Sequence, residues 1–268
     1  MSTTLSSPTT LTIGRGRAVV EMKNLWRNRQ ALGFTVLFPV MMLLLFASIF
    51  HGKVDGTTVE FSRVYVAGIM GSALMSTAFV SLAIGISMER EAGMLKRLAG
   101  TPMPKAAYFL GKIGMVLATA AIETAVLLAL GVGLFGVSLP STMHAWFTFV
   151  WVFLLGVTAS TLLGIAVGSV IRDSKSGPAV VNLPFVALQF ISGVWITVNQ
   201  LPKWLVTISE FFPLHWICRG MRAVFLPDSF KAVETGGSWQ LGMGALVLAA
   251  WCVVGFAVCT KTFRWTRG

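Results

Sequence analysis

Residues 31–50 form a run of twenty residues without a charged side chain. At a rise of about 1.5 Å per residue, a helix of that length crosses the hydrocarbon core of a bilayer, which is about 30 Å thick. Similar apolar runs recur, and the predicted spans are 31–50, 64–87, 113–137, 146–171, 177–198 and 241–260. The sequence therefore predicts an all-α integral membrane protein with six transmembrane helices.

The composition agrees with a membrane protein. Hydrophobic residues make up 55% of the chain and charged residues 12%, whereas about a quarter of a soluble domain is charged. The formal net charge of +11 would suggest nucleic-acid binding in a soluble protein. In a membrane protein, Lys and Arg instead collect on the cytoplasmic side. We therefore expect no nucleic-acid partner.

The chain has no motif for nucleotide or hydrolytic chemistry. The phosphate-binding pattern G-x-x-x-x-G-K-[ST] is absent, and Gly111 and Lys112 are followed by Ile113. The HExxH and GxSxG motifs are absent as well. Cys218, Cys252 and Cys259 form no CxxC pair, and the three histidines are far apart. We expect no catalytic site, metal, disulfide or bound cofactor, and we expect the cysteines to be packing residues.

The first thirty residues precede the first span. Residues 1–13 are rich in Ser and Thr and are predicted to be a disordered tail, so that residues 14–268 form a single transmembrane domain. In residues 14–30, apolar side chains recur on one side of a helix and basic side chains on the other. This pattern predicts an amphipathic helix in the membrane interface. A solvated basic flank is the alternative. The run 31–50 is too long for a signal-peptide core and no small-residue cleavage site follows it, so we expect it in the mature protein.

The most charged stretch, residues 88–112, lies between the second and third spans. At 100° per residue one arc is apolar and holds Met88, Ala92, Leu95, Leu98 and Ala99. The opposite arc holds Glu89, Arg90, Lys96 and Arg97, whereas Glu91 falls among the apolar residues. Residues 101–104 contain two prolines and are predicted to end the helix. This helix is either a docking element for a soluble partner or an interfacial anchor.

The distribution of basic residues predicts the orientation. Fifteen of the 21 Lys and Arg residues lie before residue 31, in 88–112, in the turn at 172–176 or after residue 260. The three opposite loops hold the other six, including Arg63 at the start of the second span. Because cytoplasmic loops are enriched in Lys and Arg, both termini and the charged stretch are predicted to be cytoplasmic, in a multi-pass protein of the inner membrane.

Two features inside the spans indicate helix contacts or function. Glu123 lies near mid-depth of the third span, where an acid is costly and either has a function or ties helices together. Gly164 and Gly168 in the fourth span have the GxxxG spacing that lets helices approach closely. Residues 199–239 are too broken by proline for a span and too apolar for an ordinary loop, so we expect two short helices that re-enter one leaflet from outside.

The charged stretch resembles the pattern E-R-E-x-G-x-L-x-x-L…T-P…Y-x-x-x-K of ABC-2 type transporter permeases. It reads E-R-E-A-G-M-L-K-R-L from residue 89, followed by Thr101-Pro102 and then by Tyr108, Gly111 and Lys112. Residues 201–222 are similar to the pattern that precedes the sixth span in that family. The resemblance covers the whole chain.

The resemblance implies a permease subunit of an ATP-driven exporter. Its expected partners are two copies of a cytoplasmic ABC ATPase, which carries the ATP and Mg²⁺, and a second permease that is identical or related. The charged stretch would then be the coupling helix that sits in a groove of the ATPase. The expected coupling residues are Glu89, Arg90, Glu91, Gly93, Leu95, Arg97 and Leu98.

Glu91 is the subject of a separate hypothesis. An acid on the apolar arc beside a basic N-terminal helix is expected to pair with a cation of that helix, and the candidates are Arg17, Lys23, Arg27 and Arg29. The alternative is that Glu91 only interacts with the helix dipole, a contribution of about 0.3–1 kcal/mol.

The substrate is expected to be a hydrophobic or amphiphilic compound such as a drug, an antibiotic or a lipid-like natural product, leaving through the cytoplasmic membrane. Candidate residues along its path are Phe79, Glu123, Asn182, Phe185, Gln189, Phe190 and Trp195. Candidates for an external gate are Pro202, Trp204, Phe212, Pro213 and Arg222. Export of a polysaccharide or lipid-linked polymer, and a non-transporting scaffold or sensor, are the alternatives.

Overall fold

The computed structural model describes residues 9–50, 52–171, 173 and 175–263. The first eight residues of the predicted tail lie outside this part, as do the basic residues Arg172, Arg264 and Arg267. The tail prediction is wrong for residues 10–13, because helix α1 already begins at Thr10. The Thr9 side chain caps this helix by accepting a hydrogen bond from the Thr12 backbone N–H at 3.4 Å.

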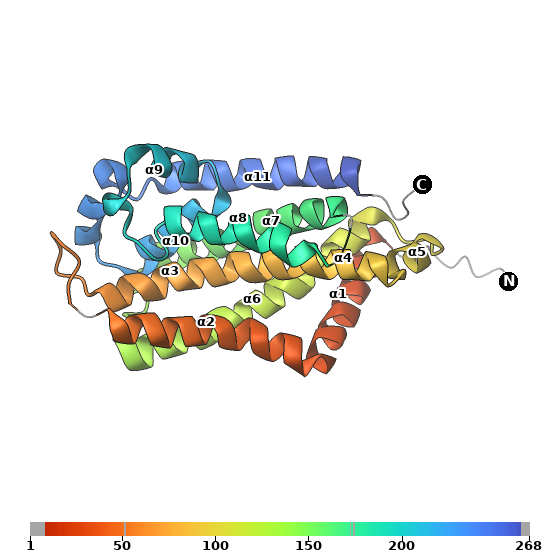
Figure 1. Cartoon of the computed structure of the whole chain (residues 1–268), viewed down its shortest axis with the longest axis horizontal. Coiled ribbons are helices and arrows are strands. Elements are labelled where there is room, and N and C mark those ends of the chain that lie inside the picture. Colours follow the sequence, from red (N-terminus) through yellow and green to blue (C-terminus); the bar gives the residue numbers. More distant parts are fainter. Residues whose placement is uncertain (1–8, 51, 172, 174, 264–268) are drawn as a thin grey trace.

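The described residues form a bundle of helices that run along one long axis (Figure 1). The α-helices are α1 (Thr10–Arg27), α2 (Arg29–Ile49), α3 (Phe61–Met75), α4 (Leu82–Glu91), α5 (Met94–Ala99), α6 (Lys105–Phe135), α7 (Met143–Val170), α8 (Gly177–Ile191), α9 (Lys203–Glu210), α10 (Pro213–Phe225) and α11 (Leu241–Thr262). A π-helical segment, η1 (Ser76–Ser81), joins α3 to α4, and 3-10 turns are η2 (Val198–Gln200), η3 (Asp228–Val233) and η4 (Thr235–Gly237). The all-helical prediction is confirmed.

In the part of the chain that the structure describes, four helices are long and apolar enough to cross a membrane: Phe61–Glu91, Lys105–Phe135, Met143–Val170 and Leu241–Thr262. Shorter apolar helices cover Gly33–Ile49 and Gly177–Ile191. The chain is thus a multi-pass membrane protein, and a topology of six spans remains a prediction. The predicted fifth span is wrong beyond Ile191, where the helix ends and Gly193 adopts the left-handed backbone at φ 78°.

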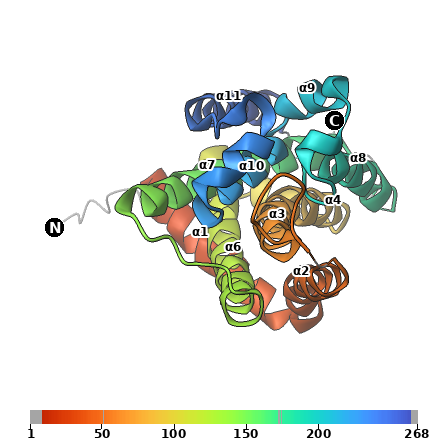
Figure 2. The ribbon, with the colours of Figure 1, turned by 90° about the vertical axis from the view of Figure 1, so that its left-hand side faces the viewer.

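Helix α3 lies at the centre of the bundle (Figure 2). Nearly all of its side chains are buried, whereas α2 and α11 expose large apolar side chains, including Phe34, Leu37, Val253 and Phe256. Exposed apolar faces on outer helices suit contact with lipid rather than water. Cys218 and Cys259 are buried and Cys252 is half-buried, as expected for packing residues.

The predicted close approach at Gly164 and Gly168 is confirmed. A Cβ on Gly164 would lie 2.9 Å from the backbone oxygens of Ala78 and Phe79, and one on Gly168 would lie 2.7 Å from that of Ala83. These two glycines therefore let α7 pack directly on the backbone of η1 and α4.

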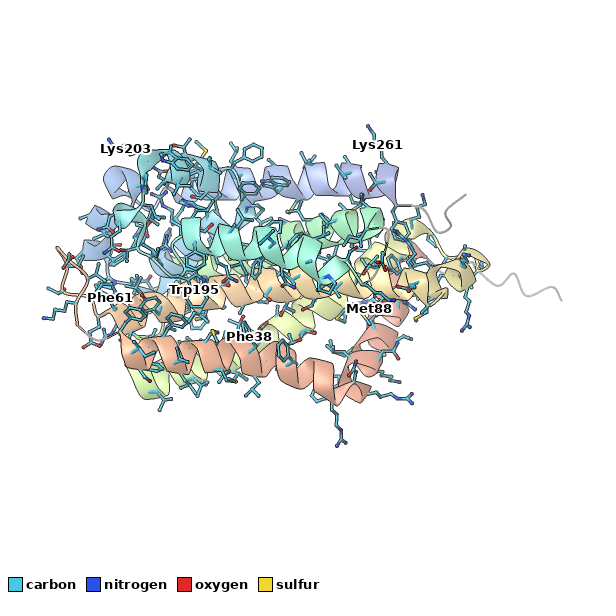
Figure 3. All side chains as sticks on the ribbon, in the orientation of Figure 1. Phe38, Phe61, Met88, Trp195, Lys203 and Lys261 are labelled. Carbon is cyan, nitrogen blue, oxygen red and sulfur yellow. The ribbon has the colours of Figure 1, made fainter. Side chains whose placement is uncertain are left out.

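The bundle has two distinct ends. Met88 and Lys261 lie towards one end, and Phe61 and Lys203 lie towards the other (Figure 3). Residues 199–239 contain the two predicted short helices, α9 and α10, followed by the 3-10 turns η3 and η4. The charged stretch and this segment are therefore at opposite ends of the molecule.

Candidate functional site

The charged stretch is not the single amphipathic helix that was predicted for residues 88–99. Helix α4 ends at Glu91, and Gly93 has a φ of 71°, a left-handed backbone that glycine adopts without steric cost. The short helix α5 then runs to Ala99. The predicted stop before the prolines is confirmed, but the chain bends at Gly93, and the bend changes which side chains face the protein.

Helix α5 lies at the end of the molecule (Figure 1). It is anchored by Leu95, which is completely buried, and by Leu98, which is half-buried. Lys96, Arg97 and Met94 are exposed on its other side. The helix thus presents a basic surface outward while its leucines attach it to the bundle.

Arg90 connects α4 to the end of α7. Its guanidinium donates to the backbone oxygen of Ser169 and, at 3.4 Å, to that of Gly168. These carbonyls lie in the last turn of α7, where backbone oxygens have no partner inside the helix and attract cations. Arg90 therefore fixes the helix that leads into the bend.

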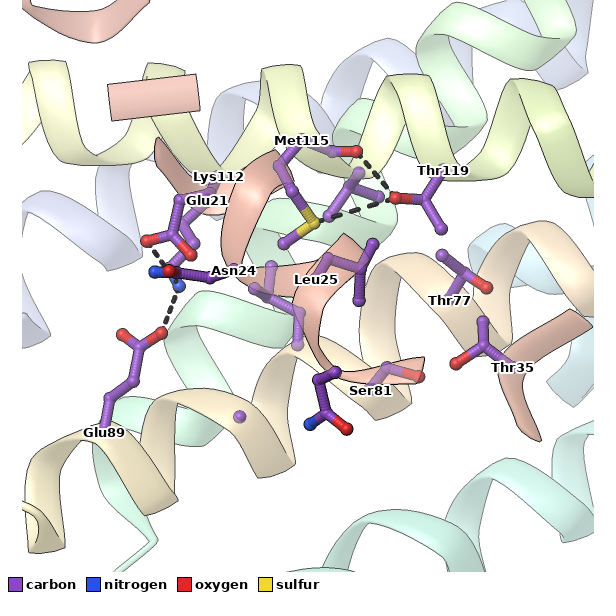
Figure 4. Close-up of a pocket in the computed structure, with 14 residues that line it drawn as sticks. Glu21, Asn24, Leu25, Thr35, Thr77, Ser81, Glu89, Lys112, Met115 and Thr119 are labelled. Carbon is purple, nitrogen blue, oxygen red and sulfur yellow. Dashed lines mark hydrogen bonds and ion pairs between the residues drawn. The ribbon is translucent and has the colours of Figure 1, made fainter. Parts of the chain in front are cut away.

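Five side chains from three helices form what we call the Lys112 cluster: Arg17 and Glu21 of α1, Glu89 of α4, and Tyr108 and Lys112 of α6. The Lys112 ammonium donates to Glu89 and lies 3.0 Å from Glu21 Oε1. Arg17 pairs with Glu21, and the Tyr108 hydroxyl donates to Glu89 Oε2 at 3.0 Å. Figure 4 shows Lys112 between the two carboxylates.

The cluster is shielded from solvent. Lys112 is 2% exposed and Glu21 6%. The Tyr108 ring lies beneath both cations, with its centroid 5.5 Å from Lys112 Nζ and 5.8 Å from Arg17 Cζ. Removing one member of such a buried pair leaves a charge without compensation. The cluster therefore links α1, α4 and α6 at the base of the bend.

Sequence reasoning identified Glu89 but missed its connection through Lys112 to Glu21. Glu21 lies in the stretch that the sequence predicts to be an amphipathic interfacial helix, and the structure buries it. The i, i+4 spacing of Arg17 and Glu21 was the available signal. Gly111 explains the burial, because a Cβ there would lie 2.5 Å from Arg17 Cγ, so only glycine lets α1 approach α6 this closely.

Glu91 lies at the last position of α4 and is exposed. Its proposed partner Arg17 pairs with Glu21, and the other candidates, Lys23, Arg27 and Arg29, are exposed. The pairing of Glu91 with a cation of α1 stays a prediction. The structure connects Glu89 to α1 through Lys112.

A cavity of about 280 Å³ lies beside the Lys112 cluster, between α1, α2, η1, α4 and α6 (Figure 4). Its lining is formed by Glu21, Asn24, Leu25, Asn28, Thr35, Thr77, Ser81, Leu82, Gly85, Glu89, Lys112, Met115, Val116 and Thr119. The wall combines hydroxyl, amide and charged groups with apolar side chains. Such mixed walls are typical of small-molecule sites.

Glu123 is buried next to this cavity. It is 1% exposed, and its Oε2 accepts a hydrogen bond of 2.6 Å from the hydroxyl of Thr77, a residue of the cavity wall. Its other oxygen, Oε1, has no hydrogen-bond partner among the residues that the structure describes. The sequence identified this acid, and the structure adds its contact with η1.

The other candidates for the substrate path lie around α8. Phe79 and Phe185 are buried in one apolar cluster, whereas Glu123 contacts Thr77 of the cavity wall. Gln189 accepts a hydrogen bond of 2.8 Å from the Trp195 indole N–H, and the Trp195 ring lies 4.5 Å from that of Phe46. Asn182 and Phe190 are exposed. The structure therefore does not bring this candidate set together around one cavity.

The opposite end of the bundle holds a second buried charge cluster. Arg222 of α10 pairs with Glu234, with an Nε to Oε1 distance of 2.5 Å, and donates to the Gly193 backbone oxygen at 3.3 Å. Arg219 donates to the backbone oxygens of Thr235 and Ser238. Arg222 is among the predicted gate residues, whereas Glu234 and Arg219 were missed.

The remaining gate candidates lie at the starts of α9 and α10. Pro202 and Trp204 lie at the start of α9 and are exposed, and Phe212 and Pro213 form the start of α10. The adjacent Asp228 is exposed, and hydrogen bonds from Lys231 and Trp239 hold its pKa below the usual range. Among the described residues, no group of three or more His, Cys, Asp or Glu side chains could hold a metal ion.

Comparison with known proteins gives consistent matches. The family model described as ABC-2 type transporter matches residues 18–226. The probable multidrug ABC transporter permease YbhR of Escherichia coli K12 is 22% identical over 171 residues, which are 63% of this chain and 46% of the relative. The daunorubicin resistance ABC transporter permease protein DrrB1 of Streptomyces coeruleorubidus is 25% identical over 238 residues, 84% of this chain and 76% of the relative. The chain spans about half the length of the E. coli relative.

Proposed function

Because this chain belongs to the ABC-2 type transporter family, we propose that it is the membrane subunit of an ATP-driven exporter of amphiphilic compounds. The family lacks ATPase activity of its own, and ATP is hydrolysed by a partner subunit. The proposed complex contains two permeases, like or related, and two cytoplasmic ATPases. In the proposed topology six segments span the membrane and both termini face the ATPases.

The observation that carries the proposal is the attachment of the bend at Gly93 to the rest of the bundle. Leu95 anchors α5, Arg90 ties α4 to the end of α7, and Lys112 joins Glu89 to Glu21 of α1. A movement of α5 would therefore be transmitted to α1, α6 and α7 through these buried contacts. A merely interfacial anchor would need no such attachment.

The exposed side of α5 is the proposed contact with the ATPase. Lys96 and Arg97 point outward there, and Glu91 is exposed just before the bend. ATP binding to the partner can shift the permease between conformations only through contacts that differ between the two states. Helix α5 is where those contacts would reach this chain, and the Lys112 cluster would transmit them.

The substrate class follows from the relatives. Their names describe multidrug transport and daunorubicin resistance. At 22–25% identity they suggest the class, an apolar compound with polar groups, rather than one molecule. The cavity between α1, α2, η1 and α6 has a wall of the same mixed character.

The test uses the tagged full-length chain with the ABC ATPase that copurifies with it. The two are reconstituted in liposomes. Uptake of daunorubicin by those liposomes whose ATPase faces outward is measured with and without ATP. We expect ATP-dependent uptake. Arg97→Glu should abolish copurification of the ATPase, whereas Lys261→Glu, a charge reversal at the exposed end of α11, should leave it intact.

Two results would overturn the proposal. If no ATPase copurifies and no ATP-dependent flux is seen, the chain is a scaffold or sensor rather than a transporter. If flux is seen only with a lipid-linked polysaccharide and not with daunorubicin, the chain exports polymers.

A further inference from the structure

Glu123 lies beside the cavity and is joined to its wall by Thr77. Thr77 and Ser81 are four residues apart on η1, and Thr119 and Glu123 are four residues apart on α6, so each pair shares one helix face. Thr77, Ser81 and Thr119 line the cavity, and Thr77 also donates to Glu123. Glu123 therefore lies one turn beyond the inner end of the cavity.

The local backbone is unusual at this point. Segment η1 is π-helical, a form that is rare and occurs frequently at functional sites. It places Thr77 against Glu123 inside an otherwise continuous helix from Phe61 to Glu91. The same segment packs on Gly164 of α7, so the irregular turn is held from both sides.

Glu123 has an unused acceptor. Its Oε1 is buried and no described residue donates to it. A buried polar atom without a partner costs free energy, and a ligand that donates to it recovers that cost. Beside the cavity, Glu21 and Glu89 are balanced by Arg17 and Lys112, whereas Glu123 has no cationic partner among the described residues. The carboxyl group that can accept a cation here is therefore Glu123.

We propose that this cavity binds the ammonium group of a cationic amphiphile, with Glu123 as its acceptor and Thr77 holding the carboxyl group in place. The inference rests on the proposed function and names the substrate class. Leu25, Leu82, Met115 and Val116 would contact the apolar part next to the amine. At about 280 Å³ the cavity holds the amine end of such a molecule rather than all of it.

The test measures binding to the full chain in phosphatidylcholine nanodiscs, without any ATPase. The two probes are daunorubicin, which carries a primary amine, and its N-acetyl derivative, in which that amine is a neutral amide. Both are fluorescent, so dissociation constants follow from titration against empty nanodiscs. We expect the amine to bind about tenfold more tightly, which corresponds to about 1.4 kcal/mol.

Substitutions locate the effect. Glu123→Gln should remove the preference for the amine, and Thr77→Val should reduce it. The matched controls are Glu60→Gln, an exposed acid at the far end of the bundle, and Thr148→Val, a buried threonine on α7, and both should keep the preference. Ser81→Phe, at a position where the wall is exposed, should weaken binding of both probes by filling the cavity.

Replacing phosphatidylcholine with phosphatidylethanolamine distinguishes two sources of the ammonium. If phosphatidylethanolamine itself occupies the site, it competes with daunorubicin and lowers its affinity for the wild type but not for Glu123→Gln. If the site takes only small molecules, the affinity of the wild type for daunorubicin does not change. Equal affinities of the two probes for the wild type, an unchanged preference in Glu123→Gln, or unchanged affinities of both probes in Ser81→Phe would overturn the inference. Because no ATP is used, these outcomes are independent of whether transport is observed.

Discussion

Lys112 of α6 lies 3.0 Å from Glu21 of α1, so a helix at the edge of the bundle is joined by a buried ion pair to one of its longest helices. The same ammonium also pairs with Glu89, just before the bend at Gly93. A single cation thus connects three helices at the base of the proposed coupling element.

Lys112→Met should destabilise the protein strongly. The substitution keeps the length of the side chain but leaves Glu21 and Glu89 without their shared cation in a buried site, at a cost of about 3 kcal/mol in the free energy of unfolding. Thermal unfolding in detergent measures the loss. Lys261→Met, at an exposed position, is the control and should leave the melting temperature unchanged. Adding Glu89→Gln to Lys112→Met should restore part of the stability, because it removes the carboxylate that has lost its paired cation, whereas Glu21 still pairs with Arg17. If the double variant is no more stable than the single one, the pair is not coupled.

Replacing Arg222 should destabilise the protein, both when the charge is lost and when the charge is kept on a side chain of different shape. Arg222→Met leaves Glu234 buried without its main partner, and we expect a loss of about 3 kcal/mol in unfolding free energy. Arg222→Lys keeps the charge but cannot donate from two guanidinium nitrogens to Glu234, so an intermediate loss is expected. The comparison is Lys231→Met, whose partner Asp228 is exposed, and no measurable change is expected there. Equal stability of the Lys and wild-type proteins would refute the role of the two contacts.

Gly164→Ala and Gly168→Ala should each force α7 away from η1 and α4. A Cβ at these positions would lie within 2.9 Å of backbone oxygens, which cannot move aside as a flexible side chain can. Overpacking of this kind costs about 1–3 kcal/mol. Chemical denaturation or thermal unfolding measures it. Gly133→Ala on α6 is the matched control, since nothing lies within 4 Å of its added methyl group and the change removes backbone freedom from a helix. A control as unstable as the two variants would show that helix packing is not the cause.

Gly93→Ala should impair the communication between the ATPase and the permease more than the fold. Alanine at φ 71° costs about 1 kcal/mol, and straightening the chain to relieve it would displace α5. We expect reduced stimulation of ATP hydrolysis by substrate in the reconstituted complex. Gly93→Asn should retain more activity, because asparagine tolerates the left-handed conformation better than alanine. Gly100→Ala, at a φ of −77°, provides the control and should behave like the wild type. An active Gly93→Ala variant would mean that the bend is not required.

Much of the architecture could be predicted because it depends on local pattern and length. The apolar runs located the helices, the prolines at 102 and 104 marked the end of α5, and the GxxxG spacing at Gly164 and Gly168 indicated a close helix contact. Hydrophobic burial and backbone hydrogen bonding act over a few turns of one helix, so the residues themselves contain this information.

The bend and the charge clusters could not be predicted in the same way. A helical wheel assumes an unbroken helix, and Gly93 breaks it, so Leu95 is buried while Glu91 is exposed. Whether Glu21 faces water or Lys112 depends on how closely α1 approaches α6, which Gly111 permits but does not require. The partners of Glu123 and Arg222 come from segments 46 and 12 residues away in sequence.

The sequence by itself therefore determined that this is a helical membrane protein, where most helices lie and which family it resembles, because those properties follow from local composition and spacing. The tertiary structure decided which charges are buried together and which acid lies beside a cavity. Ion pairs between helices depend on interhelical distances of a few ångströms, and such distances exist only once the helices have packed.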